Sequence, residues 1–166
     1  MFGIGELVVY GVHGVCRVTG TEKMRVDRKR VEYMVLESVT QENSRYYVPV
    51  ESDASMARVH PVLTREDMET LLDSDEIRED AWIADEGQRK QYYRELLSSA
   101  DRTAQLRMVA SLYAYRTAQR EAGKKFHLCD DNFLRDAERL LSSEIAVALE
   151  MTPELARNLL REKLGA

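Results

Sequence analysis

Residues 5–15 read GELVVYGVHGV, and this stretch decides the fold of the first part of the chain. Its LVVY segment is a β-type run of apolar and aromatic residues. Gly11 and Gly14 then bracket a turn, because glycine tolerates the positive φ that tight turns often need. A second alternating run begins at Val15. The stretch therefore predicts two strands joined by a short turn.

Further β-type runs follow this unit. Alternation of apolar and polar residues predicts strands over residues 15–21, 31–39 and 45–50, with a polar hairpin tip at 25–30. Pro49 suits the end or the edge of a strand. Several short strands in so few residues cannot form a large sandwich, but they can roll into a small, strongly bent barrel.

The apolar period changes from two to about 3.6 after Thr64, which predicts helices. Thr64 is a typical N-cap, and Thr152-Pro153-Glu154 marks the start of the last helix. Between them we expect a partly helical acidic linker over 73–80 and helices over 88–98, 101–121 and 130–150. The chain is thus predicted to be an α+β protein of two domains, a small β-barrel over residues 1–60 and an all-α helical domain over residues 61–166.

Composition places the chain among ordinary globular proteins. It has 166 residues, of which 44% are hydrophobic and 32% charged. It has no apolar run approaching the roughly 20 residues that span a bilayer, and the N-terminus does not read as a signal peptide. Cys16 and Cys129 lie far apart and are expected to be reduced thiols. These features favour the cytoplasm.

The net charge of −5 is unevenly distributed along the chain. Residues 1–60 hold eight basic and eight acidic side chains, whereas residues 61–166 hold 16 basic and 21 acidic side chains. DNA binding is driven by the neutralisation of phosphates by basic side chains. The sequence therefore argues against strong autonomous DNA binding, but it permits a local basic face used together with a larger partner.

Catalytic and metal-binding patterns are weak. His127 and Cys129 are the one closely spaced His/Cys pair, and zinc would require His60 and Cys16 to converge on them from the other half. No nucleophile, base and orienting group are suggested together. We therefore expect no enzyme activity, no cofactor and no metal.

Several motifs, in order, resemble the CarD family of bacterial transcription regulators. They are VVY at 8–10 with HGV at 13–15, YMVL at 33–36, YVPV at 47–50, LSSAD at 97–101 and the helix from Leu134 through Ala148. The likeness covers nearly the whole chain. The same small barrel occurs in transcription-repair coupling factor, a large motor ATPase. This chain is far shorter and lacks a phosphate-binding loop motif, so a stand-alone regulator is the better match.

The resemblance implies that the N-terminal domain is a Tudor-like (SH3-like) barrel that docks on the β subunit of RNA polymerase by pairing a strand edge. By position, Met24, Arg25 and Tyr47 fall where the family places side chains that face the polymerase. Some relatives have basic residues at the first and last of these positions. Arg25 and Arg45 are expected to supply that charge here.

The resemblance also implies that the helical domain faces promoter DNA. In the family a tryptophan wedges into the minor groove at the upstream edge of the bubble and stabilises the open complex. Trp82 is the lone tryptophan and the candidate wedge. Arg89, Lys90 and Arg94 are expected to contact phosphates from an exposed helix face, whereas Asp85 and Glu86 stand where basic residues would follow the tryptophan.

Two alternatives stay open at this point. Trp82 could simply fix the linker onto the helices, as a lone tryptophan in a folded domain usually does. The protein would then be an adaptor that binds RNA polymerase without touching DNA, a reading that the acidic helical half favours. In either case the protein is expected in the cytoplasm, associated with the nucleoid through the polymerase.

Overall fold

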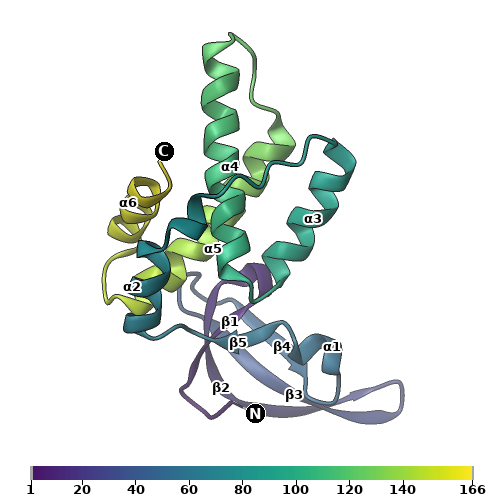
Figure 1. Ribbon diagram of the computed structural model, residues 1–166. Coiled ribbons are helices and arrows are strands. Elements are labelled where there is room, and N and C mark those ends of the chain that lie inside the picture. Colours follow the sequence, from purple (N-terminus) through teal and green to yellow (C-terminus); the bar gives the residue numbers. More distant parts are fainter. Residues whose placement is uncertain (1, 166) are drawn as a thin grey trace. The chain divides into compact units, whose positions relative to one another are not determined.

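The computed structural model describes residues 2–165, and the backbone divides into two compact units, Met1–Val62 and Leu63–Ala166 (Figure 1). The first unit holds the strands, and the second holds all of the longer helices. Across the described range, every helix is too short or too polar to traverse a bilayer.

The first unit is one antiparallel sheet in the order β4-β3-β2-β1-β5. The four predicted strands are confirmed as β1 to β4, with one short 3-10 turn, η1 (Gly11–His13), where the glycine-bracketed turn was expected. A fifth strand and a four-residue helix, α1 (Asp53–Met56), were not predicted. The strands are β1 (Leu7–Tyr10), β2 (Val15–Val26), β3 (Lys29–Ser38), β4 (Arg45–Pro49) and β5 (Val59–Pro61).

The hairpin between β2 and β3 is longer than predicted. We expected a loop over residues 25–30, but Val26 still pairs with Lys29, so the turn is only Asp27-Arg28. Both turn residues have positive φ, 48° and 66°, which is the conformation of two-residue hairpin turns that match strand twist. Cross-strand pairing therefore extends both strands through polar residues of low strand propensity.

The predicted barrel is not closed. A closed barrel would pair β4 with β5, but these strands end the sheet on opposite sides. Five strands contribute to a single core, and a bulge at Val18/Gly20 interrupts the β2–β3 register, where bulges bend a sheet. The three-residue β5 is too short to add a second ladder. The buried core residues are Val8, Cys16, Val18, Met34, Leu36, Val48 and Val59.

The second unit consists of helices whose starts follow from capping residues. Thr64, Asp85, Asp101 and Thr152 each accept a hydrogen bond from a backbone N–H in the first helical turn, at 2.9–3.2 Å. The predicted helices are confirmed, and the acidic linker contains the short 3-10 helix η2 (Asp75–Arg78). The helices are α2 (Arg65–Asp73), α3 (Glu86–Ser98), α4 (Arg102–Glu121), α5 (Leu128–Ala148) and α6 (Pro153–Leu164).

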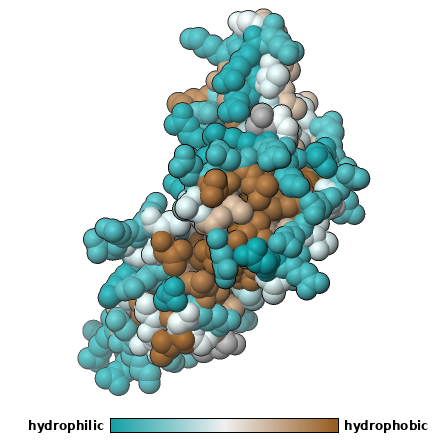
Figure 2. Space-filling model, turned by 90° about the vertical axis from the view of Figure 1, so that its left-hand side faces the viewer, coloured by the Kyte–Doolittle hydropathy of each residue, from teal (hydrophilic) through white to brown (hydrophobic). Residues whose placement is uncertain are grey.

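Helix α5 is the most buried element of the helical unit, which fits the apolar residues on nearly all of its sides. Its Glu144 is 3% exposed and receives Arg102 Nη2 at 2.7 Å and the backbone N–H of Leu63 at 2.9 Å. This carboxylate joins the start of α4 to α5 and to the chain entering α2. Apolar atoms also reach the surface on the side where α2 and α6 lie (Figure 2), and Leu155 of α6 is 57% exposed.

Candidate functional site

The first candidate surface is the free edge of the sheet at β4. In the part of the chain that the structure describes, β4 pairs with β3 on one side and with no strand on the other. The N–H of Ser52 donates to the carbonyl of Pro49 at 3.2 Å, so the chain turns away from the edge directly after the strand. Backbone groups on a free edge can hydrogen-bond to an added strand. The other end strand, β5, has three residues and ends in Pro61.

Sheet register shows which of the four predicted polymerase-facing residues share a face. Met24 pairs with Val31 and Tyr47 pairs with Val35. Val31 and Val35 lie on the same face of β3 because side chains alternate along a strand, and directly paired residues share a face. Met24 and Tyr47 therefore lie on one face, about 13 Å apart along the strand direction.

Arg45 belongs to the same face, but Arg25 does not. Arg45 is paired with Glu37, two residues beyond Val35, and its Nη2 lies 2.9 Å from the Glu37 carboxylate. That carboxylate raises the pKa of Arg45. Arg25 pairs with Arg30 and directly follows Met24 in β2. Because successive side chains of a strand alternate, Arg25 points to the opposite face of the hairpin from Met24. The structure thus groups Met24, Arg45 and Tyr47 and separates Arg25 from them.

Tyr47 is the exposed aromatic residue of this face. It is 39% exposed and stands edge-on to Tyr33, with ring centroids 6.4 Å apart. Its neighbours in β4 point the other way, since Val48 is buried in the core and Tyr46 packs against it. The edge strand therefore presents a tyrosine and an arginine on its outer face, while its inner face is fixed by the core.

The second candidate surface surrounds Trp82, which lies in the segment between η2 and α3. Its ring stacks on Tyr115 with centroids 4.1 Å apart and an interplanar angle of 24°. The guanidinium carbon of Arg89 lies 4.5 Å from the centroid of the same ring. The backbone N–H of Trp82 donates to Asp80 at 3.1 Å. Tyr115 and Arg89 thus hold the indole in place, and the side chain remains partly exposed.

The expectation that Arg89 lies on an exposed helix face is wrong. Arg89 is 4% exposed and binds the carboxylate of Asp130 through Nε and Nη2, both at 3.0 Å. Its Nη1 donates to the carbonyl oxygens of Ile83 and Ala84 at 3.0 and 3.3 Å. Burial alone would lower the pKa of Arg89, but Asp130 outweighs burial, so the pKa is raised. This guanidinium supports the loop that carries Trp82 and is not presented to a phosphate.

Lys90 and Arg94 do lie nearer the surface. Lys90 is half-buried and forms an i,i+4 ion pair with Glu86 at 3.2 Å, while Arg94 is exposed one turn further along α3. Their predicted phosphate contacts stay predictions. Sequence reasoning missed Tyr115 and Asp130, both of which hold the Trp82 loop. Among residues 2–165, no group of His, Cys, Asp and Glu side chains gathers in a way that could hold a metal ion.

Comparison with known proteins bears on the first unit. The family model of the CarD-like/TRCF RID domain matches residues 2–60. The first unit is a CarD-like/TRCF RID domain. An RID domain is an RNA polymerase-interacting domain, so the match supports a transcription-related interaction with RNA polymerase. The match spans the RID sheet from its first strand into β5 and includes the free β4 edge. A search of curated proteins gave no match to the chain.

Proposed function

We propose that this protein regulates transcription initiation and docks on the β subunit of RNA polymerase through the β4 edge of its RID domain. The observation that carries the proposal is the conjunction of an RID family match with an unpaired edge strand in the same unit. Strand addition satisfies backbone donors and acceptors, and side chains on the outer face of the edge provide specificity. Met24, Arg45 and Tyr47 are the side chains placed for that role.

The docking mode is tested by placing a negative charge on the outer face of β4. Tyr47→Glu keeps the buried Val48 and Tyr46 in place and alters only the exposed side of the strand. Tyr92→Glu is the matched control, because it is the same substitution at a tyrosine of similar exposure (38%) on α3, in the helical unit. Affinity for RNA polymerase should fall at least tenfold for Tyr47→Glu and stay unchanged for Tyr92→Glu. Equal affinities of the two variants would refute docking at β4.

The proposal continues with the helical unit, which contacts promoter DNA at the upstream edge of the bubble and stabilises the open complex. Tyr115 stacks on the Trp82 ring and the Arg89 guanidinium also lies against it, so only the part of the side chain that stays exposed is left to contact DNA. A ring fixed in advance loses little freedom on binding, and an apolar wedge favours distorted DNA. Since the protein is acidic overall, attachment to the polymerase supplies the effective concentration at DNA.

The wedge role is tested with Trp82→Ala on a promoter whose open complex is short-lived. The variant should bind RNA polymerase as the wild type does but lose most of the increase in open-complex lifetime. Trp82→Phe, which can still stack on Tyr115, should retain part of the effect. Full activity of Trp82→Ala would exclude the wedge.

A second candidate function is an adaptor that binds RNA polymerase without DNA contact. It is favoured by the burial of Arg89 and by the excess of acidic side chains in residues 61–166. Footprinting of polymerase–promoter complexes separates the two candidates. Extended protection at the upstream edge of the bubble supports DNA contact, and an unchanged footprint supports the adaptor. Both candidates are non-enzymatic, because the polymerase is the catalyst in each.

A further inference from the structure

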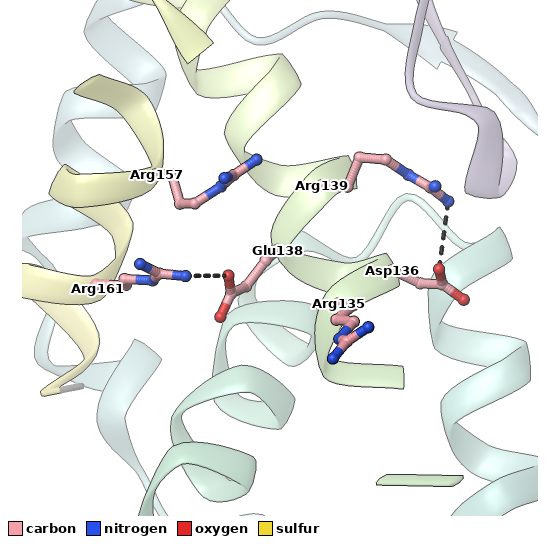
Figure 3. Close-up of a pocket in the computed structure, with 6 residues that line it drawn as sticks. All are labelled: Arg135, Asp136, Glu138, Arg139, Arg157 and Arg161. Carbon is pink, nitrogen blue, oxygen red and sulfur yellow. Dashed lines mark hydrogen bonds and ion pairs between the residues drawn. The ribbon is translucent and has the colours of Figure 1, made fainter. Parts of the chain in front are cut away.

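A groove of about 310 Å³ between α5 and α6 is lined entirely by charged side chains (Figure 3). We refer to it as the arginine groove. Four arginines face two carboxylates, which leaves two positive charges in excess. This surplus occurs in a part of the chain that is acidic overall. The lining residues are Arg135, Asp136, Glu138, Arg139, Arg157 and Arg161.

One arginine of the groove serves the fold. Arg161 donates to Glu138 at 3.1 Å, and the other oxygen of Glu138 accepts from the Tyr113 hydroxyl at 2.7 Å. Glu138 is 8% exposed. This chain of contacts ties α6 to α5 and α4, and it explains why a carboxylate stands at the back of the groove. The Glu138 carboxylate also neutralises the charge of Arg161. The positive charges of the other three arginines in the groove need a separate explanation.

Arg135 and Arg139 have only weak competing partners. Arg139 lies 3.3 Å from Asp136 and Arg135 lies 3.0 Å from Asp131, each within a single helical turn. The Arg135 side chain is 77% exposed. Exposed pairs of this kind are readily exchanged for a stronger partner because water screens them.

The side chain of Arg157 has no ion pair or hydrogen bond with any residue of the described range. In Figure 3 its side chain reaches from α6 toward α5. It lies four residues before Arg161, just as Arg135 lies four residues before Arg139. Like charges at this spacing disfavour a helix. The sequence thus places two rows of arginines on facing helices, an arrangement that costs stability unless an anion lies between them.

We propose that the arginine groove binds a small, multiply charged phosphate anion. Guanidinium groups match the oxygens of phosphate in paired hydrogen bonds, and Arg157, together with the weakly paired Arg135 and Arg139, can supply them to a multiply charged anion. A long polyanion such as DNA would need a basic surface continuing beyond the groove, whereas 19 acidic and 12 basic side chains make up the rest of residues 61–166. A compact anion needs only the groove itself.

The ligand would bridge two helices, so binding should also stabilise the helical unit. Sodium pyrophosphate is the first probe, added to the full-length protein at constant ionic strength. Inorganic phosphate and a nucleoside triphosphate are parallel probes that separate the possible sources of the phosphate group. Calorimetric titration should show saturable binding of at least one of them, and the thermal unfolding midpoint should rise with its concentration.

Three variants locate the site. Arg157→Ala should weaken binding at least tenfold, and Arg135→Ala provides a second, independent substitution on α5. Asp136→Asn should tighten binding several-fold, because it removes a carboxylate from the groove and releases Arg139. Arg120→Ala is the matched control, an exposed arginine of α4 outside the groove, and should bind as the wild type does.

Two results would overturn the proposal. One is that no probe binds the wild type saturably, or that Arg157→Ala and Arg135→Ala bind the probe as tightly as the wild type does. The other is that a 20-base-pair duplex binds in a manner lost in Arg157→Ala while the small anions do not bind, which would assign the groove to nucleic acid. No RNA polymerase is present in these assays, so their outcome is independent of the docking proposal.

Discussion

The buried pair of Arg89 and Asp130 gives the Trp82 loop its rigidity. Both side chains are almost completely buried, at 5% and 2% exposure. Removing one partner of such a pair leaves an uncompensated charge and typically costs about 3–5 kcal/mol. Asp130→Asn should therefore lower the free energy of unfolding by that amount, measured by urea titration with the fluorescence of Trp82, the sole tryptophan.

The neighbouring Asp131 provides the control. Its ion pair with Arg135 is exposed and spans one helical turn, so Asp131→Asn should cost only about 0.5 kcal/mol or less. Similar losses in the two variants would show that the buried pair has no special part in holding the Trp82 loop.

Cys16 gives the RID domain a specific sensitivity to alkali. The thiol is fully buried, and burial raises its pKa from 9.0 to about 12. As pH rises, the thiol loses its proton in the unfolded chain before it does so in the folded one. The contribution of Cys16 to the free energy of unfolding is therefore fully present below pH 9 and is lost as pH rises toward 12. Relative to Cys16→Val, the wild type should lose about 1.4 kcal/mol per pH unit in that window. Thermal unfolding at several pH values measures this, and parallel profiles for the two proteins would contradict it.

The roles of single residues were only partly predictable. Trp82 stood out because it is the lone tryptophan, but its stacking partner Tyr115 lies in α4, 33 positions later. Helical spacing in the sequence does indicate that Arg89 is buried. Arg89 lies four residues before Tyr93 and seven before Leu96, on the buried face of α3. Its partner Asp130 is 41 residues away, and no local pattern identifies it.

At the scale of elements, α5 depends on the buried carboxylate of Glu144. Arg102 is 13% exposed and donates to Glu144 through both Nε and Nη2. Glu144→Gln would leave that arginine without a counter-ion, so the helical unit should lose about 3 kcal/mol of unfolding free energy or more. Urea titration followed by far-ultraviolet circular dichroism measures the loss.

Glu150→Gln is the control for this prediction. Glu150 pairs with Arg65 at 3.4 Å, but its side chain is 84% exposed, and exposed pairs contribute little. An equally small effect of Glu144→Gln would mean that packing alone fixes α5 against α4.

Local patterns predicted elements well where caps or alternation were strong, as at Thr64 and Thr152. They failed where an element depends on a distant partner. The strand β5 has three residues and a proline, and it exists because it pairs with β1. Closure of the barrel was also predicted wrongly, because strand number alone does not determine whether the two end strands meet.

At the scale of the whole molecule, the two units support different kinds of conclusion. The RID domain is assigned by its family match, which ends at residue 60. The helical unit lies outside that match, so its proposed roles rest on its own side chains, namely Trp82 with its partners Tyr115 and Arg89, and the arginine groove. The acidic balance of residues 61–166 makes DNA contact dependent on attachment to the polymerase.

The central claim is that the backbone of β4 accepts a strand from RNA polymerase, and hydrogen–deuterium exchange tests it most directly. Amide exchange should be compared in the free protein and in its complex with RNA polymerase, for peptides covering Arg45–Pro49 and Val59–Pro61. Complex formation should slow amide exchange in β4 and leave exchange in β5 unchanged. Unchanged exchange in β4, or protection confined to β5, would contradict it.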